Sequence, residues 1–192
     1  ETVPELARRA KVATAALGVA STAEKDAALH AAADLLEANA DAITEANAVD
    51  VANAEAEGMD SGLVDRLRLD ESRIAGMAGG LRQVAALRDP VGEITEGWVR
   101  PNGLRIEKTR VPLGVVAIIY ESRPNVTSDA FGLCLKSGNV AFLRGSSSAI
   151  TSNLAIASVL REALPKAGLP ADALVVVDDT RREAATAFMQ QR

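Results

Sequence analysis

Polar side chains gather in three short loops, each of which follows a run of apolar and β-branched residues. The loops are residues 121–125, 144–148 and 178–180. In an open parallel sheet, ligands bind at the carboxyl ends of the strands. These loops are therefore the first places to look for a site.

The second loop has the composition of an anion-binding turn, Arg144-Gly145-Ser146-Ser147-Ser148. Small residues that lead into a helix present backbone N–H groups and hydroxyls, and the helix dipole favours negative charge there. Arg144 adds a planar cation suited to phosphate. The loop is neither a Walker loop nor a G-x-G-x-x-G turn. An alternative stays open, in which the serines only cap the helix and Arg144 is a surface cation.

The other two loops carry an amide and a pair of acids. The amide of Asn125 could donate a hydrogen bond to a developing oxyanion, although an Asn after Pro124 is also a common turn former. Asp178 and Asp179 resemble a metal pair, but acids just before a helix are usually partners of its dipole. We favour the dipole interpretation and predict no metal site.

The nucleophile and base candidates are few. Cys134 is the only cysteine and lies inside an apolar run, which is typical of a buried hydrophobic residue rather than a catalytic thiol. His30 is the only histidine, and nothing in the sequence brings a nucleophile elbow to it.

The first 87 residues have a helical pattern. A capping box at Ser21 and Glu24 precedes an apolar stripe, and Asp70 caps a later helix. Glycine ends other helices at Gly18 and Gly58. The sequence therefore predicts short packed helices over about 4–17, 22–37, 41–57 and 71–88.

From residue 91 the pattern changes to strands. Residues 91–100 and 104–112 flank Pro101-Asn102-Gly103, which predicts a β-hairpin that is either a local edge or an arm pairing with another subunit. Beyond it, strands alternate with helices, which predicts a parallel sheet covered by helices on both faces. The expected strands are 115–120, 140–143 and 174–177, and the expected helices are 127–136, 148–167 and one from 181.

Composition limits the classes of protein that are possible. The chain has 192 residues, enough for one domain or one and a half, and its net charge of -5 argues against nucleic-acid binding. No apolar run could cross a bilayer, and a single cysteine excludes an internal disulfide. We expect a cytoplasmic, acidic, soluble protein with no membrane partner.

Several motifs together are more specific than any single loop. They are residues 110–116, Ile119-Tyr120-Glu121-Ser122-Arg123-Pro124-Asn125-Val126-Thr127, 132–139 and 143–146, with 47–51, 63–67 and 89–92 upstream. These segments resemble the gamma-glutamyl phosphate reductase family of the aldehyde dehydrogenase superfamily, and the resemblance covers nearly the whole chain.

The resemblance implies an NADP-dependent acyl-phosphate reductase, an oxidoreductase of proline biosynthesis. Such enzymes reduce gamma-glutamyl phosphate with NADPH to glutamate 5-semialdehyde and phosphate, by way of a cysteine thioester. By resemblance, Asn125 stabilises the oxyanion. The absence of an acid at 144–148 favours NADP over NAD. The implied cofactor-binding residues are Tyr120, Glu121, Pro124, Arg144, Gly145, Ser146 and Ser147.

The resemblance also implies an aldehyde dehydrogenase-like fold in truncated form. Residues 1–88 would be the helical part of the cofactor domain, 89–112 an oligomerisation hairpin, and 113–192 the first half of a Rossmann-like nucleotide-binding domain. The thioester domain and its nucleophilic cysteine would be absent, so this chain alone would be inactive. A homo-oligomer through the hairpin and a functional link to glutamate 5-kinase are expected. The alternative is a non-catalytic fragment that only binds cofactor or oligomerises.

Overall fold

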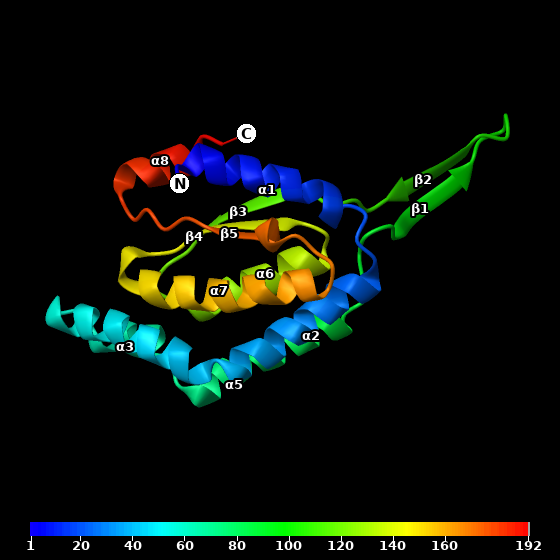
Figure 1. Cartoon of the computed structure of the whole chain (residues 1–192). Helices are drawn as coiled ribbons and strands as arrows, with labels where there is room; N and C mark the ends of the chain where they lie inside the picture. The colour runs from blue at the N-terminus through cyan, green and yellow to red at the C-terminus, as the bar shows by residue number, and fades with distance from the viewer. Residues whose placement is uncertain (192) are drawn as a thin grey trace.

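The structure is a computed structural model that describes residues 1–191. Its layers are stacked on a small parallel sheet, and a hairpin projects from the body (Figure 1). The helices before the hairpin are α1 (Val3–Leu17), α2 (Thr22–Ala38), α3 (Ala40–Ala56), α4 (Ser61–Leu67) and α5 (Glu71–Ala86). The hairpin strands are β1 (Ile94–Val99) and β2 (Arg105–Thr109). The remainder comprises β3 (Val115–Ile119), α6 (Asn125–Lys136), β4 (Val140–Arg144), α7 (Ile150–Lys166), β5 (Leu174–Val176) and α8 (Arg182–Met189), with 3₁₀ turns at Ser147–Ala149 and Ala171–Ala173.

The three-stranded sheet has the order β3-β4-β5, and both pairings are parallel. Helices α6 and α7 cover one face, while α1 and α8 cover the other (Figure 1). Phe142 of β4 stacks on Phe188 of α8 with ring centroids 4.6 Å apart. The predicted parallel sheet with helices on both faces is confirmed.

Burial is less even than the apolar runs suggest. Val140 to Leu143 of β4 are buried, but Ala117 and Ile119 of β3 are exposed. In the parallel register Ala117 pairs with Phe142, so both side chains point to the face that α1 and α8 cover. Those helices are centred on β4, so the edge strand β3 stays open on that face.

Alanine-rich helices form a further layer behind α6 and α7. Helix α2 packs on α5 and α7, and α5 packs on α6. Ala28, Ala32 and Ala33 of α2 are completely buried. Their small side chains let helices approach closely, and one hydrophobic core continues from these helices into the sheet.

The predicted helix boundaries are largely confirmed, because they depend on local capping. The Ser21–Glu24 capping box is present, and the Asp70 side chain accepts the Arg73 amide at 2.7 Å. Helix α4 was not predicted from the sequence, since seven residues are too short for a periodic pattern. The division of the chain into domains at 88 and 112 stays a prediction.

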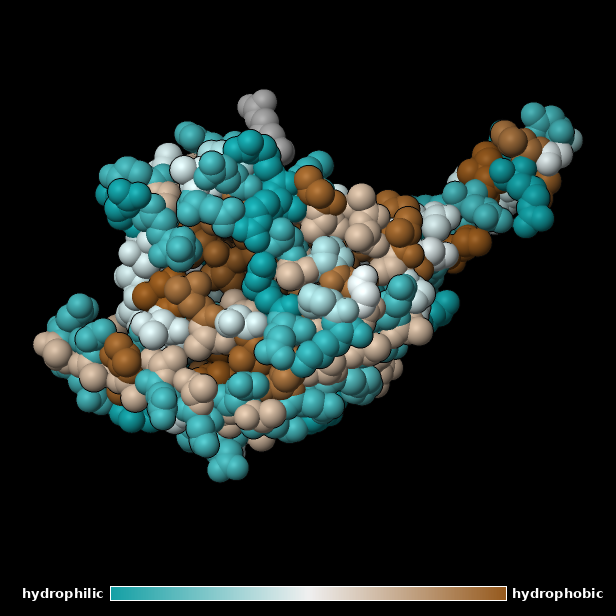
Figure 2. All heavy atoms as spheres, in the orientation of Figure 1, coloured by the Kyte–Doolittle hydropathy of each residue, from teal (hydrophilic) through white to brown (hydrophobic). Residues whose placement is uncertain are grey.

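The hairpin projects from the body and does not lie against the sheet (Figure 1). Its turn contains Gly103 at a φ of 86°, a conformation that glycine adopts without strain. Apolar side chains on it are exposed, and Figure 2 shows hydrophobic residues among hydrophilic ones on this arm. The exposed residues are Ile94, Trp98, Val99 and Leu104.

Among residues 1–191, no helix is both long and apolar enough to span a membrane.

Candidate active site

The three polar loops meet at the carboxyl ends of the parallel strands. The hydroxyls of Ser122 and Ser148 lie 2.6 Å apart and connect the first loop to the second. Arg144 connects the second loop to the third by donating from Nη2 to the carbonyl oxygen of Thr180 at 3.1 Å. The sequence predicted this meeting, because the carboxyl ends of parallel strands share one edge of a sheet.

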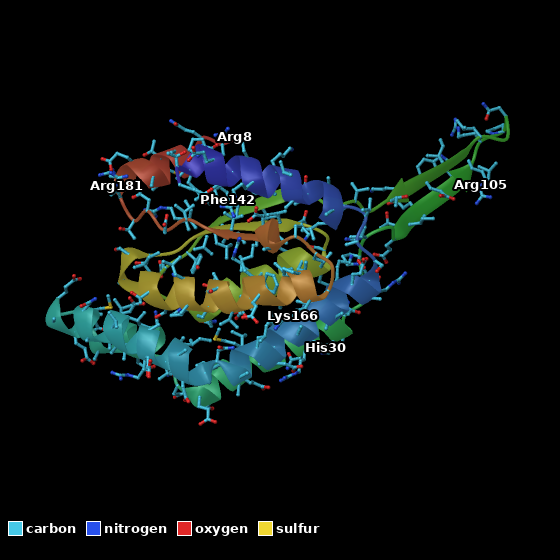
Figure 3. The ribbon with its side chains drawn as sticks, viewed as in Figure 1. Arg8, His30, Arg105, Phe142, Lys166 and Arg181 are labelled. Carbon is cyan, nitrogen blue, oxygen red and sulfur yellow. The ribbon has the colours of Figure 1, made fainter. Side chains whose placement is uncertain are left out.

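Arg144 is held by main-chain oxygens rather than by acids. Besides Thr180, its Nη2 donates to the carbonyl of Arg181 at 3.3 Å. Figure 3 shows Arg181 where the third loop enters α8. The Nε of Arg144 is buried and has no hydrogen-bond partner among residues 1–191. Arg144 as a whole is half-buried, so its guanidinium group, rather than the buried Nε, is the part that an anionic ligand can reach.

Gly145 occupies a space that admits no side chain. A Cβ at this position would lie 2.2 Å from Nδ2 of Asn153 and 3.2 Å from the Tyr120 ring. Those two residues are joined through Thr127, whose hydroxyl is 2.7 Å from the Tyr120 hydroxyl and 3.2 Å from Oδ1 of Asn153. Burial raises the pKa of the Tyr120 hydroxyl, so Tyr120 stays neutral and positions the loop.

The serines of the second loop make different contacts. The Ser146 hydroxyl lies 2.8 Å from that of Ser148 and accepts the Ser148 amide at 3.3 Å. Ser147 is exposed, and its hydroxyl makes no hydrogen bond within residues 1–191. Of the two serines predicted to bind cofactor, Ser146 already caps the 3₁₀ turn, and Ser147 is exposed to solvent.

The start of α7 is occupied by a carboxylate from another helix. Asp50 of α3 accepts the amides of Thr151 at 3.3 Å and Ser152 at 2.7 Å. The sequence pattern predicted that backbone amides at the start of this helix could bind a phosphate, but in the structure they donate to Asp50. Anion binding at this loop would therefore depend on Arg144 rather than on the α7 dipole.

Asn125 begins α6 and is exposed at the site. Its Nδ2 donates to Oδ2 of Asp129, one turn along, at 3.1 Å. An amide nitrogen carries two hydrogens, so one remains for a substrate oxygen. Partial burial raises the pKa of the Asp129 carboxyl, an effect that the hydrogen bond from Asn125 partly offsets. Of the other two predicted residues in this loop, Pro124 is buried and Glu121 is exposed.

An open cavity of about 440 Å³ lies beside Asn125. Helix α4 and the residues after it, helix α5, and the start of α6 line this cavity. Its polar lining is rich in arginine. The charged lining residues are Asp65, Arg66, Arg68, Arg73, Arg123 and Asp129. The sequence analysis did not identify this cavity, because its residues are far apart in the chain.

The other candidate groups do not assemble into a site. The guanidinium of Arg181 pairs with Asp179 and lowers the pKa of that carboxyl to about 2. Within residues 1–191 no three His, Cys, Asp or Glu side chains form a metal cluster. His30 is exposed on α2, on the opposite side of the sheet from Arg181 (Figure 3).

Cys134 is a core residue, as its apolar neighbours in the sequence indicated. It is buried in α6, and burial raises the pKa of its thiol to about 11. At neutral pH it is a protonated thiol and a poor nucleophile.

Sequence reasoning did not single out Ser122, Asp50 or Asn153. Asn153 lies on the buried stripe of α7, so a polar residue among apolar ones was the available signal. Asp50 carried no such signal, because its partners are about a hundred residues away.

The model of the aldehyde dehydrogenase family matches residues 1–192 of the chain. The chain belongs to the aldehyde dehydrogenase family. The family of the predicted fold is thereby confirmed.

Two curated relatives that are more than half identical to the chain have the same name. The chain is 53% identical over 184 residues to the gamma-glutamyl phosphate reductase of Caldanaerobacter subterraneus. The aligned region covers 96% of the chain and 44% of that protein. It is 55% identical over 181 residues to the protein of the same name from Brucella anthropi. Here the aligned region covers 94% of the chain and 42% of that protein. The chain therefore spans less than half the length of the curated relatives it matches.

Two solved structures are similar to the chain. The gamma-glutamyl phosphate reductase of Thermotoga maritima superposes with a TM-score of 0.97 at 42% identity, over 100% of this chain and 46% of that one. A glyceraldehyde-3-phosphate dehydrogenase of Methanocaldococcus jannaschii, solved with NADP, gives a TM-score of 0.67 at 18% identity, over 91% of this chain and 36% of that one. The second likeness shows the fold alone.

Proposed function

We propose that this chain is the cofactor-binding part of an NADPH-dependent gamma-glutamyl phosphate reductase, which forms glutamate 5-semialdehyde and phosphate. The observation that carries the proposal is the position of Asn125, which begins α6 at the meeting of the polar loops and beside a polar cavity. The names of the relatives supply the reaction. Its place in proline biosynthesis and its link to glutamate 5-kinase belong to the same proposal.

The residues at the end of β4 fit a dinucleotide. The half-buried guanidinium group of Arg144 and the exposed hydroxyl of Ser147 are donors for phosphate or ribose oxygens. Because Gly145 has no side chain, the backbone of this loop packs closely against the ring of Tyr120. Glu121 and Pro124 are proposed to border the same site. NADPH, when bound, supplies the hydride.

The preference for NADPH over NADH rests on charge. A 2′-phosphate adds negative charge, which an arginine stabilises and a nearby acid would repel. Residues 144–148 contain no acid, and Asp179 of the neighbouring loop is paired with Arg181. Arg144 is the cation proposed to interact with the phosphate.

Asn125 would stabilise the transition state. When a nucleophile adds to the acyl carbon, negative charge develops on the carbonyl oxygen, and an oriented amide N–H stabilises that oxygen. Asp129 holds one hydrogen of the Asn125 amide and so fixes the direction of the other. Asp129 is thus proposed as a positioning residue.

The nucleophile of the proposed reaction lies outside these residues. Cys134 is the only cysteine of the chain, and it is buried with its thiol pKa raised to about 11. We therefore propose that the chain by itself binds cofactor without turning over substrate.

One observation favours an additional role in assembly. The hairpin presents Trp98 and its apolar neighbours to solvent. An exposed apolar ribbon with unpaired strand edges is suited to pairing with a second copy of the chain. Light scattering should then give a mass above that of one chain, and Trp98→Glu should lower it.

Calorimetric titration with NADPH and with NADH tests the cofactor assignment. NADPH should bind saturably and more tightly than NADH, and Arg144→Ala should weaken NADPH binding by about tenfold. Arg105→Ala is the matched control, because Arg105 is an exposed arginine on the remote hairpin (Figure 3). Equal affinity for both cofactors, or none for either, would contradict the proposal.

A further inference from the structure

The arginine-lined cavity beside Asn125 is a candidate site for the part of the substrate that does not react. Its walls come from α4, α5 and α6, and its volume of about 440 Å³ is in the range of small-molecule sites. It opens next to the amide that is proposed to contact the acyl oxygen. Whatever occupies it would therefore be attached close to the reacting carbon.

Two of the four arginines in the cavity are already paired. Arg73 donates to the Asp65 carboxylate at 2.9 Å and to the Arg68 carbonyl at 2.7 Å. Arg68 donates to Glu55 at 2.9 Å. Arg73 thus holds the end of α4 against α5, and Arg68 joins the residues after α4 to α3.

The other two arginines are Arg66 and Arg123. The side chains of Arg66 and Arg123 make no hydrogen bond or ion pair with any of residues 1–191. They come from different segments, α4 and the β3–α6 loop, yet both line the same cavity. Two guanidinium groups on one cavity are suited to a carboxylate or a phosphate.

The carboxylate of Asp129 distinguishes between those two ligands by its charge. Its Oδ2 accepts the Asn125 amide, and its Oδ1 has no hydrogen-bond partner among residues 1–191. A free carboxylate oxygen in the cavity repels a phosphate but accepts a hydrogen bond from an ammonium group. The lining therefore favours a ligand that carries both charges.

We propose that this cavity binds the α-amino acid end of the substrate, with the carboxylate on Arg66 and Arg123 and the ammonium group on Asp129. The inference rests on the proposed function and names the residues that recognise the glutamyl group. The Asn125 amide and the Asp129 carboxylate are joined at 3.1 Å, so the free amide hydrogen and the free Oδ1 lie on either side of that hydrogen bond, a few ångströms apart. An extended glutamyl chain spans a similar length between its γ-acyl group and its α-nitrogen.

Titrations of the 192-residue chain with four small ligands test the site. The ligands are L-glutamate, glutarate without the ammonium group, 4-aminobutyrate without the α-carboxylate, and inorganic phosphate. L-glutamate should bind at least about tenfold more tightly than each of the others, because each of them loses a charge-assisted contact or meets Asp129. Equal binding of glutarate, preferential binding of phosphate, or no binding of L-glutamate would overturn the proposal.

Matched variants locate the binding. Arg123→Gln and Arg66→Gln should each weaken L-glutamate binding about tenfold, and Asp129→Asn should remove the preference for L-glutamate over glutarate. Arg68→Gln lines the same cavity but loses only its pair with Glu55, so L-glutamate affinity should be unchanged. An equal loss in Arg68→Gln would overturn the assignment. Thermal melts confirm that each variant is folded.

The NADPH titration separates this inference from the proposed function. Arg144 does not line the cavity, so cofactor binding and L-glutamate binding are measured independently. NADPH binding without L-glutamate binding would overturn the cavity assignment alone. Selective L-glutamate binding without NADPH binding would support the amino-acid site and contradict the cofactor proposal.

Discussion

The carboxylate of Asp50 accepts both the backbone N–H and the hydroxyl of Ser152, at 2.7 and 2.6 Å. Helix α7 has no side-chain cap of its own, and the carboxylate that caps it comes from α3. Asn47 of α3 strengthens the same junction by donating to the hydroxyl of Ser152 at 3.0 Å. The loop that carries Arg144 therefore enters a helix whose start is fixed by residues from the other half of the chain.

Asp50→Ala should destabilise the fold markedly. The substitution leaves the buried amide of Ser152 without a partner and removes a cap, so the free energy of unfolding should fall by about 2–4 kcal/mol. Urea denaturation measures this change. Glu45→Ala, at an exposed position of the same helix, should change stability little. Similar losses in both variants would mean that the Asp50 junction contributes nothing special.

Gly145→Ala should disturb the second loop. The added methyl group would approach Nδ2 of Asn153 to 2.2 Å, so Asn153 or the loop must move. We expect a loss of about 1–3 kcal/mol and weaker NADPH binding. Gly79→Ala, in the interior of α5 with open space at the Cβ position, should instead be neutral or stabilising by up to about 1 kcal/mol. The pair of variants separates steric crowding from the general effect of replacing glycine.

Stability should decline in acid because two carboxyl groups are stabilised in ionised form. Burial opposes ionisation of Asp89, but hydrogen bonds from Lys25, Thr22 and the Val91 amide outweigh it and lower the pKa of the carboxyl. Hydrogen bonds from Arg9 and, to a smaller extent, Arg161 lower the pKa of Asp172, although partial burial opposes the shift.

A lowered native pKa fixes the direction of this pH dependence. Above the unfolded-chain value of about 3.9, the contribution of both carboxylates is fully present, and it is lost as the pH falls through their native pKa values. Thermal melts between about pH 7 and pH 2 should show Tm falling mainly below about pH 4. Asp89→Asn should be less stable at neutral pH and should show a flatter decline in acid. A melting temperature that stays constant down to about pH 2 would contradict this expectation.

Cys134 should react slowly with alkylating reagents in the native chain. Its thiol is buried, and its pKa of about 11 leaves little thiolate at neutral or mildly alkaline pH. Mass spectrometry after iodoacetamide treatment should find the native protein unmodified under conditions that label the urea-unfolded chain completely. Rapid labelling of native protein, at a rate that rises with NADPH, would instead make Cys134 a candidate nucleophile.

The sequence by itself determined the features that depend on near neighbours. The capping box at Ser21 and the cap at Asp70 act over three residues, and the turn at Asn102-Gly103 acts over two. Apolar runs predicted the parallel strands, and the apolar surroundings of Cys134 predicted its burial. These signals are readable because the forces behind them act between residues close in the chain.

The tertiary structure alone decided which polar groups are free to bind a ligand. Arg66 and Arg73 have the same side chain and lie on adjacent helices, yet Arg73 is paired with Asp65 and Arg66 has no partner in the part of the chain that the structure describes. The sequence pattern predicted that the amides at the start of α7 are open to an anion, whereas in the folded chain they donate to Asp50 of α3. Such pairings join residues distant in the chain, so they exist only when packing has fixed the distances between elements. The physical reason is that hydrogen bonds and ion pairs act over a few ångströms in space, whatever the separation along the sequence.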